Sequence, residues 1–216
     1  MRKVLLTSAL FFAAYASFAQ VAVVKQAKSE NDPAKAAKIL EPALSDPTTS
    51  NDPNTWKMAG DFQKAIYDAE NMKLYLPGGK ADTTKLYNSL AKMFQYYMKC
   101  DKVEAEKVKS GELKKPKLHK KLADALTTVR PNLTNGGSDA YNSGDYKKAL
   151  KFFGLYVDAA SNPLFDEKPA VKNDTLVPLI ACYAALAANS LNDKPAIIKY
   201  ATIGKANKEE GYRALI

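Results

Sequence analysis

The stretch that decides the fold is residues 133–157, LTNGGSDAYNSGDYKKALKFFGLYV. Its first half places Leu133, Gly137 and Ala140 four and then three residues apart, which puts all three on one face of a helix. Its second half repeats this spacing with Ala149 and Phe153, and Asn-Ser-Gly-Asp separates the halves. The pattern predicts two short amphipathic helices joined by a tight turn, with small residues where the helices touch.

These residues resemble the tetratricopeptide repeat (TPR), in which a large and a small residue line the first helix. An Ala-x3-Phe pair lines the second helix of that repeat. Leu133 and Gly137 match the first pair, residues 144–146 match the turn, and Ala149 and Phe153 match the second pair. The resemblance implies an all-α fold of antiparallel helix-turn-helix repeats.

A second, weaker match lies over residues 54–69, where Trp56 and Gly60 have the spacing of the first TPR helix. Ala59 and Gln63 stand there in place of Leu and Tyr. The next predicted helix covers residues 83–99, and in it Ser89 stands where the repeat would have Ala. Gly60 is expected to let the paired helix approach the Trp56 ring.

Further helices follow from the same spacing. We expect a helix over residues 34–44, after the Asn-Asp-Pro start at 31–33, with Pro42 weakening its last turn. Residues 45–54 are expected to form a loop. Residues 175–190 and 195–203 form another predicted pair, in which Ala196 and Tyr200 occupy the second-helix positions.

Taken together, the resemblance implies one TPR-like α-solenoid over residues 20–216, with about three to four helix pairs of which the last is incomplete. Residues 208–216 begin another helix and stop in mid-pattern. An accessory domain of a longer protein therefore remains an alternative.

Residues 1–19 have the layout of a cleavable signal peptide: Arg2 and Lys3, then a mostly apolar run that ends in Ser-Phe-Ala. The expected cut lies between Ala19 and Gln20. The alternative is a membrane anchor, but the run is short for a span of roughly 20 residues. The prediction is an exported protein of the periplasm or cell envelope, and the whole is similar to exported TPR proteins of Bacteroidetes-type bacteria.

The chain is basic, with 32 Lys and Arg against 23 Asp and Glu. Lysine supplies almost all of the positive charge, whereas phosphate and base recognition usually relies on the planar fork of arginine. Nucleic acid is therefore not an expected partner. Residues 99–121 are the most lysine-rich part, and they are predicted to be a solvated connector or the charged ends of two helices. The alternative is a patch for an anionic envelope polymer.

No catalytic, cofactor or metal site is predicted. The single histidine, His119, lies among lysines that offer a general base no partner. Cys100 is placed after a helix end and Cys182 inside a helix, and a disulfide between them stays open because their spacing is not known from the sequence. None of the common catalytic or phosphate-binding motifs occurs. The chain is predicted not to be an enzyme.

The expected function is a non-catalytic scaffold or adaptor that binds a protein or peptide partner in a concave groove. By the TPR resemblance, the groove would be lined by the first-helix residues opposite the packing stripe. The predicted residues are Lys57, Asp61, Lys64, Ser138, Tyr141, Asn142 and Asn189.

Overall fold

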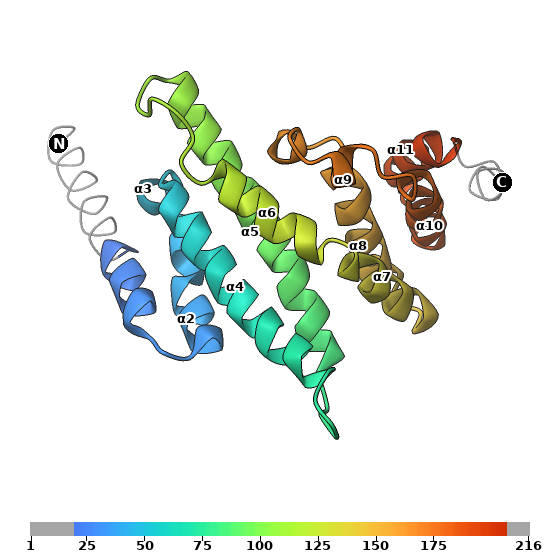
Figure 1. Ribbon diagram of the computed structural model, residues 1–216, viewed down its shortest axis with the longest axis horizontal. Coiled ribbons are helices and arrows are strands. Elements are labelled where there is room, and N and C mark those ends of the chain that lie inside the picture. Colours follow the sequence, from blue (N-terminus) through green and yellow to red (C-terminus); the bar gives the residue numbers. More distant parts are fainter. Residues whose placement is uncertain (1–19, 207–216) are drawn as a thin grey trace, which may run out of the picture. The chain divides into compact units, whose positions relative to one another are not determined.

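The computed structural model describes residues 20–206. The predicted signal peptide and the helix predicted from Lys208 onward lie outside this range. The described residues are helical and contain no strand, which confirms the all-α prediction (Figure 1). The chain divides into two compact units, with the boundary between Lys117 and Leu118. No helix among the described residues is both long and apolar enough to cross a membrane.

The first unit begins with a helix over residues 20–29. It continues with α2 (Pro33–Leu40), the 3-10 helix η1 (Glu41–Leu44), α3 (Pro47–Ser50), α4 (Pro53–Lys73) and α5 (Thr83–Lys109). Helix α5 extends ten residues beyond its predicted end and takes in part of the lysine-rich stretch. Cys100 therefore lies inside α5 rather than after a helix end, which corrects the sequence-based placement.

Three Asp-Pro pairs begin helices in this unit. Asp32, Asp46 and Asp52 each accept a hydrogen bond from a backbone amide of the first turn, and the following proline takes the first helical position. Aspartate satisfies an amide that the helix leaves free, and proline has none to satisfy. The start of α2 was predicted this way. The same pair at Asp46 starts α3 within the predicted loop.

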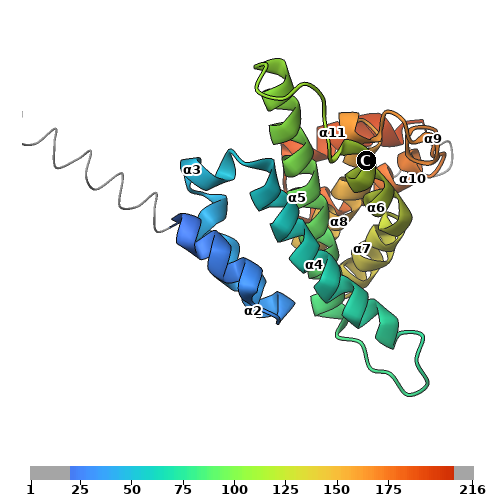
Figure 2. The same ribbon diagram turned by 60° about the vertical axis from the view of Figure 1, so that its left-hand side comes forward.

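Helices α4 and α5 form an antiparallel pair (Figure 2). The Cys100 thiol donates to Pro53 O at 3.1 Å, and the Tyr97 hydroxyl donates to Asp61 at 2.8 Å. The later α4 residue therefore contacts the earlier α5 residue, as an antiparallel pair requires. A Cβ at Gly60 would lie 2.2 Å from the Tyr97 ring. Gly60 thus permits a close approach of the paired helix, but to Tyr97. The Trp56 ring instead contacts Tyr96, with ring centroids 5.9 Å apart.

The second unit consists of α6 (His119–Val129), α7 (Asn132–Asn142), α8 (Tyr146–Ala159), η2 (Pro163–Phe165), α9 (Pro169–Lys172), α10 (Val177–Ser190) and α11 (Lys194–Gly204). The decisive stretch forms α7 and α8, with Gly144 at φ +77° in the turn between them. A Cβ at Gly137 would lie 2.3 Å from Phe153 Cε1. The prediction that a small residue lies where the two helices touch is therefore confirmed, and the structure adds that Phe153 is its neighbour.

Arg130 joins the α6–α7 junction to the end of α8. Its side chain is 3% exposed, and its Nε and Nη2 donate to Tyr156 O at 3.1 and 3.0 Å. Nη1 pairs with Asp174 at 2.6 Å, and the Tyr156 hydroxyl donates to the same carboxylate at 2.5 Å. A carbonyl in the last turn of a helix lacks an intrahelical partner and carries partial negative charge, so a buried guanidinium stabilises it.

Replacing Gly137 with Leu is expected to lower the free energy of unfolding by about 1–3 kcal/mol, because the new side chain overlaps the Phe153 ring. Urea denaturation followed by circular dichroism measures the change. Ser138→Leu at the adjacent exposed position is the matched control and should leave the midpoint nearly unchanged. Equal effects of the two substitutions would contradict the close α7–α8 contact.

Replacing Arg130 with Leu is expected to cost about 3–5 kcal/mol, because it leaves Asp174 and the end of α8 without their cation. Arg130→Lys should recover only part of the loss, since an ammonium cannot reproduce the planar fork. Thermal unfolding of both variants beside Lys147→Leu, an exposed position on α8, gives the comparison. An Arg130→Leu protein as stable as the wild type would show that the network contributes nothing.

Candidate binding groove

A groove of about 430 Å³ lies in the first unit, among α2, η1, α4 and α5. Each helix contributes side chains at intervals of three and four residues, so each presents one face to it. The lining residues are Ala34, Ala37, Lys38 and Glu41 from α2 and η1, Gln63 and Ile66 from α4, and Lys85, Asn88, Ser89, Lys92 and Tyr96 from α5. The volume falls within the range of small-ligand and peptide sites.

Two buried polar residues belong to this lining. Ser89 is 3% exposed, and its hydroxyl donates to Leu86 O at 2.9 Å within α5. Gln63 is 6% exposed, and its amide makes no hydrogen bond with any other residue of the 20–206 range. An amide offers two donors and an acceptor, and buried polar groups are nearly always paired. The Gln63 amide is therefore available to a bound molecule.

The walls of the groove carry more positive than negative charge. Lys38 and Lys92 are exposed and form no ion pair among the described residues, and Glu41 is likewise unpaired there. Tyr96 lies beside Glu41, and its pKa is raised by burial and by that negative charge. The phenol therefore stays protonated at neutral pH and keeps a donor. The groove suits an anionic ligand that also offers hydrogen-bond acceptors.

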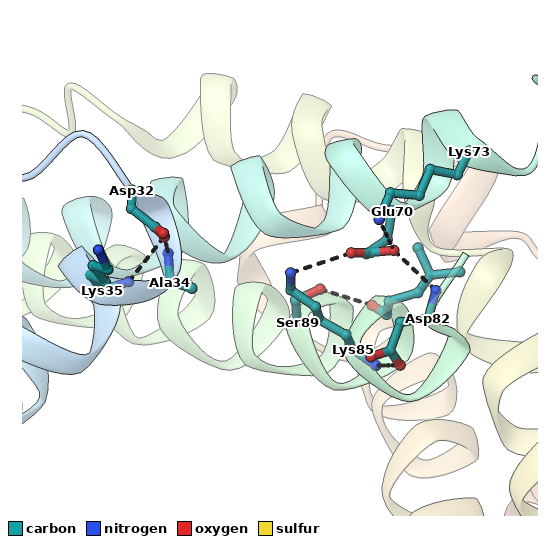
Figure 3. A network of polar contacts seen from close by, with 9 residues as sticks. Asp32, Ala34, Lys35, Glu70, Lys73, Asp82, Lys85 and Ser89 are labelled. Atoms are coloured by element: carbon teal, nitrogen blue, oxygen red, sulfur yellow. Dashed lines mark hydrogen bonds and ion pairs between the residues drawn. The ribbon is translucent and has the colours of Figure 1, made fainter. Parts of the chain in front are cut away.

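Glu70 fixes the third lysine of the groove, Lys85 (Figure 3). The Glu70 carboxylate is almost fully buried and accepts from Lys73 Nζ at 2.8 Å and from the Asp82 backbone amide at 3.0 Å. Its second oxygen lies 3.3 Å from Lys85 Nζ. These contacts connect the last turn of α4 with the first turn of α5 and outweigh the cost of burying the charge. They lower the pKa of Glu70 to about 2, with Lys73 as the largest cause.

The residues predicted to line a groove lie elsewhere on the helices. Lys57, Asp61 and Lys64 lie on α4, where Lys57 pairs with Asp61 and Lys64 pairs with Asp68 at 2.5 Å. Three others, Ser138, Tyr141 and Asn142, lie on α7, and Asn189 lies on α10. Ser138, Asn142 and Asn189 are exposed, whereas the Tyr141 ring packs edge-on against Tyr146. None of the seven lines the groove described above, and their role in partner binding stays a prediction.

The sequence contained a signal for the groove. Gln63 and Ser89 are two of the positions where the chain departs from the TPR pattern, and both line the groove, whereas a third departure, Ala59, does not. The α5 residues 85, 88, 89, 92 and 96 form a polar stripe at helical spacing. What the sequence could not show is that α2 lies opposite this stripe, because that placement depends on packing between distant segments.

The residues considered for chemistry lie apart from this groove. Cys100 and Cys182 are both buried and free, and the Cys182 thiol donates to Gly204 O at 3.5 Å. Burial and nearby carboxylates raise the pKa of Cys100 to about 12, which keeps it a thiol. His119 is the first residue of α6. Within residues 20–206, no three His, Cys, Asp or Glu side chains are grouped as metal ligands would be.

Comparison with protein families, with curated proteins and with solved structures found no match to this chain.

Replacing Glu70 with Gln is expected to destabilise the protein at neutral pH by about 1–3 kcal/mol, the size of hydrogen bonds to a charged group. The folded pKa lies below the unfolded value of 4.5, so the stabilisation by the carboxylate is present above about pH 5 and is lost as the pH falls toward 2. The difference between wild type and Glu70→Gln should therefore shrink over that interval. Chemical denaturation at several pH values measures it.

Glu106→Gln is the matched control, since Glu106 is exposed on α5 and lies 4.0 Å from Lys102. Its effect should be small at every pH, because an exposed ion pair stabilises by about 0–1 kcal/mol. A difference between wild type and Glu70→Gln that stays constant from pH 7 to pH 2 would show that the Glu70 charge is not responsible.

Proposed function

We propose that the protein is a non-catalytic binding module that holds an acidic, extended segment of a protein partner in the groove among α2, α4 and α5. The observation that carries the proposal is Gln63, a largely buried residue whose amide opens onto the groove and has no hydrogen-bond partner among the described residues. The amide is open to the groove, where water satisfies it until a ligand replaces that water. A ligand with backbone-like donors and acceptors supplies what it lacks.

The length of the groove favours an extended chain. The α5 stripe runs from Lys85 to Tyr96, which is roughly 16 Å at 1.5 Å per residue. An extended segment of about five residues spans the same distance. Asn88 and Gln63 offer amides to its backbone, and Ala34, Ala37 and Ile66 offer apolar contacts to its side chains. Amides and apolar contacts together suit a peptide better than a fully charged polymer.

The charge of the groove favours acidic residues in the segment. Lys38 and Lys92 lack ion-pair partners within the described residues, and one carboxylate, Glu41, opposes them. Carboxylates of the partner would pair with these lysines without displacing an existing ion pair. Electrostatic attraction of this kind also speeds association, since residues 20–216 hold 30 Lys and Arg against 23 Asp and Glu, a net charge of +7.

The wider setting is part of the same proposal. We take the two units as parts of an exported TPR-like scaffold or adaptor of the Bacteroidetes type, acting in the periplasm or cell envelope. The Gly137–Phe153 contact between α7 and α8 supports the repeat resemblance, and the pattern of residues 1–19 supports export.

A random decapeptide display library, selected on the immobilised chain of residues 20–216, tests the proposal. Enriched peptides are expected to alternate Asp or Glu with apolar residues, and to bind at least ten-fold more weakly to Lys92→Glu because the substitution reverses a groove charge. Gln63→Leu should weaken binding about five- to ten-fold, the size of one lost hydrogen-bonding group. Fluorescence anisotropy of a labelled selected peptide measures both effects.

Lys114→Glu is the matched control, because Lys114 is exposed in the connector after α5 and does not line the groove. It should bind the peptide as the wild type does. If Lys114→Glu weakens binding while Lys92→Glu does not, the lysine-rich residues 99–121 are the binding patch and the groove proposal is wrong. Enrichment of peptides without acidic residues would contradict it as well.

A further inference from the structure

The connection between α4 and α5 exposes a run of large apolar side chains. Met72, Leu74, Tyr75 and Leu76 are between 52% and 78% exposed. The other exposed large hydrophobic residues of the 20–206 range are isolated: Val21, Leu176, Leu191 and Ile198. Single exposed apolar residues are ordinary, whereas a contiguous group marks a contact site. We call residues 72–76 the apolar tip.

The apolar tip is held in a defined conformation. Successive turns link it, with Leu74 N donating to Asn71 O, Tyr75 N to Met72 O, and Gly79 N to Leu76 O at 3.1, 3.1 and 2.9 Å. A Cβ at Gly79 would lie 2.1 Å from Lys73 O, so the backbone approaches itself here too closely for any residue with a side chain. The Glu70 contacts close the base of this loop. The exposure of the tip is therefore built into the fold.

The tip is convex within the first unit. The α4–α5 loop extends beyond the ends of both helices in Figures 1 and 2. Leu74, Tyr75 and Leu76 are consecutive and each is more than half exposed. Consecutive residues in a turn point in different directions, so one flat surface cannot cover all three. A medium that surrounds the tip, such as a fluid hydrocarbon layer, can cover all three side chains at once.

The polar residues around the tip fit an anionic interface. Between Glu70 and Lys85 the chain has three lysines and two carboxylates, which leaves a net charge of +1. Glu70 is buried and binds Lys73 and Lys85, whereas Asp82 is exposed and accepts from the Lys85 amide as the cap of α5. Lys80 is exposed beside the tip. Tyr75 adds a ring of the kind that favours the boundary between headgroups and acyl chains.

From these observations we infer that the apolar tip inserts into the surface of an anionic lipid bilayer and attaches the first unit to it as a peripheral protein. Burial of the four apolar side chains drives the attachment, and Lys80 adds attraction to anionic headgroups. The inference is independent of the groove, since no tip residue lines it.

Flotation with unilamellar vesicles of phosphatidylcholine and phosphatidylglycerol, mixed three to one, tests the inference on residues 20–216. Residues 1–19 are omitted because their apolar run would itself enter lipid. Wild type is expected to float with the vesicles. Tyr75→Ser combined with Leu76→Ser should lower the partition coefficient at least ten-fold, and Lys80→Glu should lower it about five-fold or more.

The matched control is Leu176→Ser combined with Ile198→Ser, which removes two equally exposed but isolated apolar residues from the second unit. This variant should float as the wild type does. Circular dichroism of all variants checks that they are folded. No flotation of the wild type, or equal losses for the tip and control variants, would overturn the inference.

A spectroscopic measurement locates the contact. Because Cys100 and Cys182 are buried, a cysteine introduced by Tyr75→Cys can be labelled selectively with an environment-sensitive dye. Its emission should shift to the blue and rise when vesicles are added, whereas the dye at Ile198→Cys should not respond. A blue shift without vesicles that grows with protein concentration would show that a second copy covers the tip, which would overturn the inference.

Discussion

The first unit depends on one buried carboxylate. Glu70 stands at the end of α4 and binds Lys73 of its own helix, the Asp82 amide and Lys85 at the start of α5. Burying a carboxylate is costly, and only a complete set of partners makes it favourable. Satisfying Glu70 therefore brings the two helix ends together. This junction positions two surface features. Lys85 is the first α5 residue of the groove wall, and the loop that joins the two helix ends forms the apolar tip.

The other contacts between α4 and α5 run in the same antiparallel direction. Glu70 lies beside Asp82, Gly60 packs against Tyr97, and Pro53 O accepts from the Cys100 thiol. The second unit uses a cation in the corresponding role. Arg130 closes the end of α8 and reaches Asp174 before α10 begins. In both units a buried charge at a helix end fixes how neighbouring helices meet, while small residues set how closely they approach.

Much of the helical architecture could be predicted from residue spacing and capping. The α7–α8 pair, the Asp-Pro start of α2 and the weak turn at Pro42 all follow from local chemistry, which the sequence displays directly. The prediction was less accurate where tertiary contacts decide. Helix α5 continues past Lys99 because Cys100, Val103 and Glu104 are buried against the rest of the unit, a fact that polar composition concealed. The groove required the position of α2 relative to α5, which no local pattern contains.

The buried polar residues of the two units differ in whether the protein itself satisfies their hydrogen-bonding groups. Ser89 replaces a small apolar residue, but its hydroxyl bonds to Leu86 O, so the helix itself satisfies it. Arg130 is a buried charge that is likewise fully engaged within its unit. Gln63 is 6% exposed, compared with 3% for each of the other two, and its amide has no partner between residues 20 and 206. A buried polar residue whose hydrogen bonds are all made inside the protein needs no ligand, because those hydrogen bonds offset the free-energy cost of burying it. The Gln63 amide, in contrast, has no partner in its unit, and for this reason it is the residue on which we base the proposed ligand site.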